Sequence, residues 1–132
     1  MIDRKHVGRA LPKAVLEVEK GRLRFFAKAI GETNPIYLDE AAAKAAGYPS
    51  LPAPPTFLFA AELDANTLVP ALQDMGIDLS RILHGEQRFD YLAPVCAGDT
   101  ITVESTFTDI YEKKNGALEF LVKESLVTNQ HG

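Results

Sequence analysis

The chain has 132 residues, of which 46% are hydrophobic and 24% are charged, a composition typical of a globular protein that can bury a core without disulfides. Its formal net charge of −4 argues against a nucleic-acid partner. The first twelve residues hold no apolar stretch resembling a signal peptide, and no run is long enough to cross a membrane. With Cys96 as the single cysteine, these features predict a cytoplasmic protein.

A short strand and an amphipathic helix are the first elements expected. Residues 13–18 alternate loosely between polar and apolar types, which predicts the strand. The apolar residues spaced as one helical face are Leu23, Phe26, Ala27 and Ile30. Gly31 follows where a glycine commonly ends a helix.

A turn and a short helix come next. The residue before a proline avoids the α region, so Asn34, which precedes Pro35, is expected to be extended. Asp39 is a suitable N-cap for a helix over residues 40–46, and Gly47 would end that helix.

The next stretch predicts a stiff loop followed by a buried helix. Residues 48–55 hold four prolines, which favours an extended loop. A second long helix is expected to begin near Pro55 or Thr56. Its opening, Phe57 to Ala61 and then Leu63, is apolar on every side, so this helix must be covered all round.

From residue 82 onward the pattern predicts strands. The expected strands cover residues 82–91, 100–112 and 118–127, with a hairpin turn at 114–116. The side chains expected on the core face are Ile101, Val103, Ser105 and Phe107 on one strand and Phe120, Val122 and Leu126 on the next. A buried helix and a β meander predict an α+β domain whose sheet wraps the helix. The chain stops where one further strand is expected, so it stays open whether the last strand of the fold is missing from this sequence.

The segment from Phe26 to Tyr37 ends in Gly-Glu-Thr-Asn-Pro-Ile-Tyr and resembles the hydratase motif of MaoC-like proteins, Gly-Asp-x-Asn-Pro-Ile-His. Residues 43–48, 52–57 and 84–89, with Pro94 and Gly98-Asp99 after them, fit the N-terminal, FAS1-type dehydratase branch of that family. The resemblance covers nearly the whole chain. It implies one hot-dog domain over residues 1–132, in which a long central helix is wrapped by a curved antiparallel sheet.

The same resemblance implies that the chain binds an acyl thioester of coenzyme A or acyl carrier protein, without a cofactor. The family reaction is the reversible hydration of 2-enoyl thioesters. In active relatives the Asp and His of the motif activate water and protonate the α carbon, and amides near the start of the central helix hold the thioester oxygen. The matching positions here are Glu32 and Tyr37 for the dyad and the backbone near Thr56 and Phe57 for the amides.

Both dyad positions depart from the family pattern. Glu32 moves the carboxylate by about one methylene, and displacements of about 1 Å can cost roughly a hundredfold in rate. Tyr37 replaces a histidine by a phenol of unperturbed pKa about 10, a poor general base near neutral pH. The pair is either a rebuilt acid–base couple or a solvent-facing carboxylate beside a packed tyrosine.

Some members of this branch work in pairs, and the chain looks similar to the substrate-binding partner of a dyad-bearing subunit. A homodimer or a heterodimer with a second MaoC-like subunit is therefore expected. The alternatives are a self-sufficient enoyl-thioester hydratase, a hot-dog thioesterase with Glu32 as base, and an acyl-thioester binding or scaffold domain without chemistry.

Each remaining candidate has a functional and a structural interpretation. Asn34 either orients the substrate or caps its turn. Thr56 either donates near the thioester oxygen or serves as the helix N-cap. His84 either replaces the lost base or lies in a half-buried strand or an interface, and the adjacent Gly85 suggests a close backbone approach or a bulge. Residues 57–63 either line an acyl tunnel or form plain core. Three scattered histidines and one cysteine predict no metal site.

Overall fold

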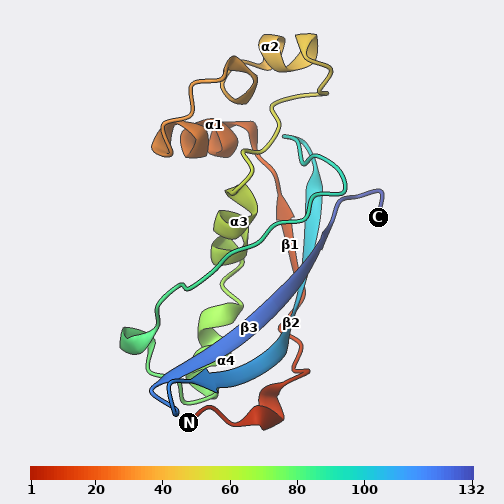
Figure 1. Ribbon diagram of the computed structural model, residues 1–132. Coiled ribbons are helices and arrows are strands. Elements are labelled where there is room, and N and C mark those ends of the chain that lie inside the picture. Colours follow the sequence, from red (N-terminus) through yellow and green to blue (C-terminus); the bar gives the residue numbers. More distant parts are fainter.

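The computed structural model describes residues 1–132 and shows an antiparallel sheet with helices along one side and at one end (Figure 1). The strands are β1 (Ala14–Glu17), β2 (Thr100–Lys113) and β3 (Leu118–Thr128), which pair in the order β1-β2-β3. The α-helices are α1 (Lys20–Ala29), α2 (Glu40–Ala45), α3 (Phe57–Ala65) and α4 (Leu68–Asp74). Short 3-10 turns cover Arg4–His6, Pro35–Tyr37 and Leu79–Arg81. The predicted α+β architecture is confirmed, with α3 lying along the sheet.

The elements predicted before residue 56 are confirmed. The expected strand is β1, and the expected amphipathic helix is α1, which buries Leu23 and Ala27. Gly31 follows α1 with a φ of +74°, the left-handed conformation that glycine adopts without strain. Asp39 caps α2 through a hydrogen bond from the amide of Ala41 to its carboxylate, at 3.1 Å.

The hairpin between β2 and β3 is also confirmed. Lys114, Asn115 and Gly116 have φ values of 53°, 54° and 85°. Positive φ angles twist a hairpin turn in the sense that the flanking strands require, and Asn-Gly sequences accommodate them at low cost. The turn therefore sets the register of the two longest strands.

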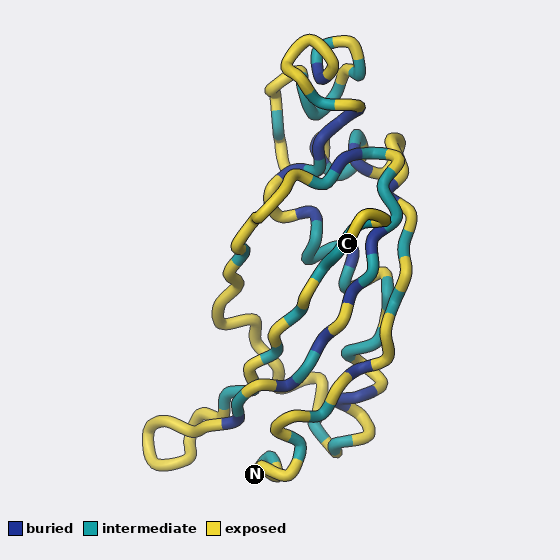
Figure 2. Tube along the Cα trace, turned by 90° about the vertical axis from the view of Figure 1, so that its right-hand side faces the viewer, coloured by how far each residue is buried: buried dark blue, intermediate teal, exposed yellow.

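On β2 the predicted core face is correct, because Ile101, Val103, Ser105 and Phe107 are all buried. Beyond Phe107 the register shifts by one residue, and Ile110 also points inward, opposite Leu121. A bulge of this kind adds one residue to one strand and bends it. The bulge allows β2 to present core side chains both before and after the bend. Figure 2 shows buried and exposed positions alternating along the tube.

On β3 the predicted core face is wrong. The side chains of Val122 and Leu126 are exposed, and Phe120 lies on the same outer face, stacked on Tyr111. The register decides the face, since residues directly opposite each other in a sheet share a side. The β3 residues opposite or packed against the buried positions of β2 are Leu121, Lys123, Ser125 and Val127. Two of these inward residues are polar, which is why the sequence pattern indicated the other face.

The helix α3 contributes Phe57 and Ala61 to the core, but it is shorter and less covered than predicted. It has nine residues, and the side chain of Leu63 is 55% exposed. Glu62 and Asp64 give the helix polar positions that its apolar opening obscures. The predicted cover on every side is therefore wrong for the half of the helix that contains Leu63.

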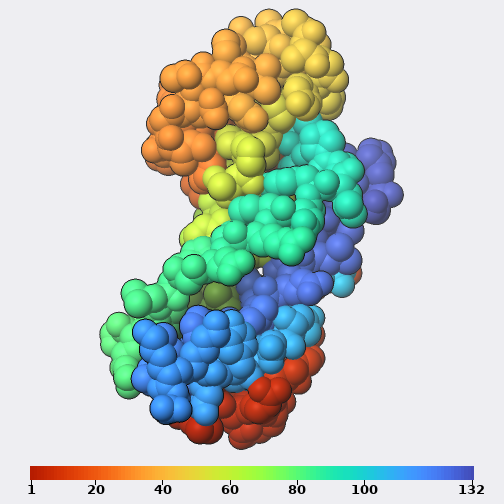
Figure 3. Space-filling model, in the orientation of Figure 1, coloured from red at the N-terminus to blue at the C-terminus, as the bar shows by residue number.

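Residues 82–94, called here the crossing segment, form no strand, so the strand predicted over residues 82–91 is wrong. The segment is extended and passes over α3 (Figures 1 and 3). Leu83 and Leu92 are 91% and 98% exposed. A strand needs a hydrogen-bonded neighbour, and this segment pairs with no edge of the sheet. None of the helices is long and apolar enough to span a bilayer.

Candidate functional site

Glu32 lies in the loop that leaves α1, and its carboxylate is used by the loop itself. The amide of Glu32 donates to the carbonyl of Ala27 at 2.9 Å, which continues the end of the helix. Its Oε1 accepts hydrogen bonds from the amides of Thr33 and Asn34, both at 3.0 Å. One carboxylate oxygen therefore caps the backbone of the motif loop.

Asn34 adopts the extended conformation predicted before a proline, with φ −66° and ψ 123°. Its Oδ1 accepts a hydrogen bond from the amide of Ile36 at 3.2 Å, and this starts the 3-10 turn Pro35–Tyr37. The capping role expected for Asn34 is thus present. The turn carries Tyr37 to a groove that it lines together with residues distant in the sequence.

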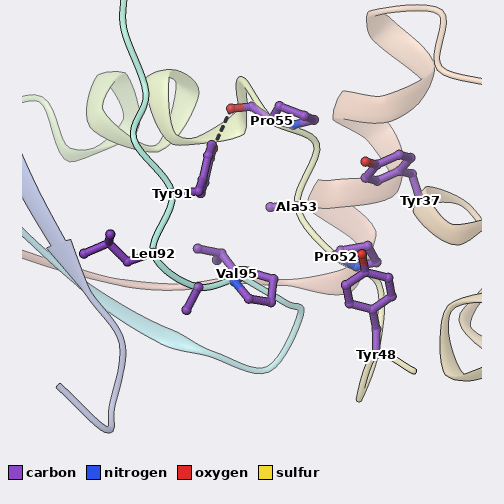
Figure 4. Close-up of a pocket in the computed structure, with 10 residues that line it drawn as sticks. Tyr37, Tyr48, Pro52, Ala53, Pro55, Tyr91, Leu92 and Val95 are labelled. Atoms are coloured by element: carbon purple, nitrogen blue, oxygen red, sulfur yellow. Dashed lines mark hydrogen bonds between the residues drawn. The ribbon is translucent and has the colours of Figure 1, made fainter. Parts of the chain in front are cut away.

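Tyr37 lines an open groove of about 350 Å³ at the start of α3 (Figure 4). The groove is lined mostly by apolar side chains from three segments: Tyr37, Tyr48, Pro52, Ala53, Pro55, Tyr91, Leu92, Ala93, Pro94 and Val95. Tyr37 comes from the motif turn, the proline-rich loop forms the floor, and the crossing segment forms the far wall. The groove thus joins the motif loop to the residues that precede α3.

Three tyrosines line this groove, and two of them, Tyr37 and Tyr91, have raised pKa values. Burial raises the pKa of Tyr37, and the nearby Glu32 carboxylate and Tyr48 raise it further. Burial also raises the pKa of Tyr91, with a smaller contribution from Tyr37. Both phenols therefore keep their protons at neutral pH. Tyr37 can donate a hydrogen bond, the Tyr91 hydroxyl already donates one to the carbonyl of Pro55, and neither is suited to remove a proton.

Thr56 and Phe57 stand at the start of α3 as predicted, with different roles. Thr56 occupies the N-cap position, but its hydroxyl makes no capping hydrogen bond. The amide of Phe57 donates to the carbonyl of Pro54 at 2.9 Å, and its ring packs edge-on against Phe26 with centroids 5.5 Å apart. Phe57 is therefore a core residue, and Thr56 is an exposed one beside the groove.

His84 and Gly85 are not among the residues that line the groove. The His84 ring stacks on Phe59 of α3, with centroids 4.9 Å apart, and its Nε2 lies 3.1 Å from the carbonyl oxygen of Glu86. A Cβ added to Gly85 would meet no atom within 4 Å. The close approach or bulge predicted at Gly85 is therefore wrong, because the segment is outside any sheet.

The groove also contains residues that the sequence did not single out. Tyr48 belongs to the proline-rich loop, and Tyr91 belongs to the segment predicted as a strand. Their tyrosine side chains were the available signal, since Tyr often places an apolar ring and a hydroxyl at one binding surface. No three His, Cys, Asp or Glu side chains gather closely enough to hold a metal ion.

Comparison with known proteins places this geometry in a family. Residues 5–132 match the family described as "FAS1-like, dehydratase domain region". A "UPF0336 protein" of Streptomyces avermitilis is 46% identical over 110 residues, which cover 83% of this chain and 73% of that protein.

Among solved structures, the truncated HadBC complex of Mycobacterium tuberculosis, a 3R-hydroxyacyl-ACP dehydratase, has a chain with a TM-score of 0.81 and 26% identity; the match covers 96% of this chain and 88% of that one. A "MaoC-like dehydratase" reaches a TM-score of 0.85 at 23% identity, over 96% of this chain and 38% of its own. The protein therefore belongs to the FAS1-like dehydratase domain family and shares the hot-dog fold of the MaoC-like dehydratases.

Proposed function

We propose that this chain is the substrate-binding subunit of an acyl-thioester dehydratase or hydratase, and that a dyad-bearing partner supplies the acid–base chemistry. The observation that carries the proposal is the groove beside α3. There the motif turn places a protonated Tyr37 where the family motif has a histidine. A groove with apolar walls and a few hydroxyl donors suits an acyl thioester, which has an apolar tail and one carbonyl oxygen to receive a hydrogen bond. Tyr37 and the nearby Thr56 are the donors we assign to that task, since the Tyr91 hydroxyl already donates to the carbonyl of Pro55.

The carboxylate of Glu32 has a structural role in the motif loop. One oxygen of Glu32 is committed to the amides of Thr33 and Asn34. Glu32 and Asn34 therefore shape the motif loop, and under this proposal they position Tyr37 and a partner's dyad.

Similarity to the HadBC complex supports the need for a second subunit, since that enzyme is an assembly of two different chains. We propose a heterodimer with a second MaoC-like subunit that keeps the Asp and His of the motif; a homodimer is the alternative. We also propose that residues 1–132 act as one domain, and that the complex works in the cytoplasm on thioesters of coenzyme A or acyl carrier protein.

The test is hydration of 2-butenoyl-coenzyme A by the purified chain, alone and co-expressed with a dyad-bearing partner. We expect no turnover by the chain alone and turnover by the pair. Glu32→Ala and Tyr37→Phe in this chain should raise the KM of the pair more than they lower its kcat, because they alter binding and not proton transfer.

The other candidate functions give different results in the same assay. Full turnover by the chain alone, abolished by Glu32→Ala, would identify a self-sufficient hydratase. Release of free coenzyme A without hydration would identify a thioesterase. Binding of the thioester without turnover in every pairing would identify a scaffold and contradict the proposal.

A further inference from the structure

The inner face of the sheet carries polar side chains in the middle of an apolar core. The ammonium group of Lys123 on β3 lies 2.9 Å from the carboxylate of Glu62 on α3. The Lys123 side chain is 19% exposed and the Glu62 side chain is 15% exposed. One step along the same sheet face, the hydroxyl groups of Ser105 and Ser125 are 2.8 Å apart. We call these four residues the polar belt.

The polar belt lies between two separate apolar clusters. One cluster surrounds the start of α3: Val18, Leu23, Ala43, Leu51, Phe57, Ala61, Ile101 and Val103. The other contains Leu11, Ala71, Leu72 and Phe107, near α4. Along β2, Ser105 stands between Val103 of the first cluster and Phe107 of the second. The core of this fold is therefore divided where α3 faces β3.

The belt lies further along the same helix that begins at the groove. Glu62 follows Phe57 by five positions, which is about 8 Å along a helix axis. Glu62 and Lys123 also line a second, smaller hollow of about 50 Å³, together with Phe59 and Leu63 of α3. Figure 3 shows a narrow gap between the crossing segment and β3 on this side of the molecule. A tail that entered at the groove and followed α3 would therefore arrive at the Glu62–Lys123 pair.

An apolar tail cannot pass this pair at low cost. Pushing the two side chains apart leaves a poorly solvated charge without its partner, which is strongly unfavourable. Lying against the intact pair gives the tail a polar neighbour in place of the apolar surface that favours its burial. Every carbon that reaches the belt thus adds little to affinity.

We propose that the Glu62–Lys123 pair ends the acyl site and restricts this chain to short acyl thioesters. The inference rests on the proposed function, because it assumes that the groove at the start of α3 holds the thioester. It adds the residues that determine tail length.

The test compares a belt variant with a matched control. Glu62→Leu with Lys123→Met removes both charges at once, so neither is left unpaired, and such replacements are often neutral for stability. The control is Arg22→Met with Asp64→Leu, which removes an exposed ion pair of 2.7 Å between α1 and α3. Thermal unfolding first establishes that each double variant is folded. Calorimetry then gives the dissociation constants of 2-butenoyl-, 2-hexenoyl- and 2-decenoyl-coenzyme A.

The native chain and the control should bind the decenoyl thioester no more tightly than the hexenoyl one. The belt variant should bind the decenoyl thioester about tenfold more tightly than the native chain, the effect of burying about two further methylene groups, with 2-butenoyl binding unchanged. Two results would overturn the inference while leaving the proposed function intact. One is native binding that strengthens steadily with tail length. The other is a belt variant whose dissociation constants for the three thioesters stand in the same ratios as those of the native chain. Failure of the native chain to bind any of the three thioesters would overturn both.

Discussion

The hydroxyl group of Tyr91 donates a hydrogen bond to the carbonyl oxygen of Pro55, and this bond joins the crossing segment to the loop just before α3. The His84 ring, stacked on Phe59 of α3, also contacts this helix from the crossing segment. The tyrosine and the histidine therefore help to hold the far wall of the groove in a largely exposed stretch of chain.

Replacing Tyr91 by phenylalanine should loosen the crossing segment without unfolding the domain. The loss of one hydrogen bond between uncharged groups costs about 1 kcal/mol. Amide hydrogen exchange should accelerate over residues 82–94, and thioester affinity should fall. Tyr111→Phe is the control, since Tyr111 lies on the outer face of the sheet, stacked on Phe120. Equal exchange rates in the native chain and Tyr91→Phe would show that the bond does not hold the segment.

Tyr37 and Tyr91 of the groove should make the protein less stable at high pH. Their pKa values are raised above the ordinary 10.0 in the folded state. Below that pH both states are protonated and the contribution to stability is fully present. As the pH rises further the unfolded chain ionises first, so the free energy of unfolding falls until the folded-state pKa values are passed.

Urea unfolding at a series of pH values through 10 tests this dependence. Tyr37→Phe with Tyr91→Phe should flatten the decline relative to the native chain. The pKa of the Cys96 thiol is also raised by burial, from 9.0, and would contribute in a neighbouring window. The comparison is therefore made in a Cys96→Ala background. If the free energy of unfolding declines equally steeply with pH in the native chain and in the double variant, the two tyrosines do not cause the decline.

Restoring the family dyad should raise hydratase activity. Glu32→Asp with Tyr37→His places a carboxylate and an imidazole in a turn that already lies beside the groove. General acid–base groups typically contribute about a hundredfold or more to rate. Hydration of 2-butenoyl-coenzyme A measures the gain, with Tyr111→His as a control for an added histidine elsewhere. Unchanged activity would mean that the rest of the groove does not hold the substrate in a reactive position.

A pair of phenylalanine variants tests which face of the sheet is the core. Phe107 is fully buried, so Phe107→Ala should lower the free energy of unfolding by about 3–5 kcal/mol. Phe120 lies on the outer face, and Phe120→Ala should cost roughly 1 kcal/mol, mostly from the lost stack on Tyr111. Urea unfolding gives both values. Equal costs would mean that β3 is paired in a different register.

The sequence predicted the elements whose causes are local. Asn34 is extended because a proline follows it, Asp39 caps α2 through its own carboxylate, and the turn at Asn115-Gly116 adopts positive φ. Each of these outcomes depends on a few neighbouring residues and on backbone sterics. The resemblance of the motif from Phe26 to Tyr37 also indicated the hot-dog fold, which the similarity to solved structures supports.

Tertiary structure alone decided which face of β3 is buried and whether residues 82–91 form a strand. Phe120, Val122 and Leu126 form an apolar pattern, yet the register with β2 turns Lys123 and Ser125 inward, where Glu62 and Ser105 meet their polar groups. The crossing segment has strand-like residues but lies over α3 and pairs with no strand of the sheet. Faces and pairings depend on partners far away in the chain, and periodicity within one segment carries no information about them.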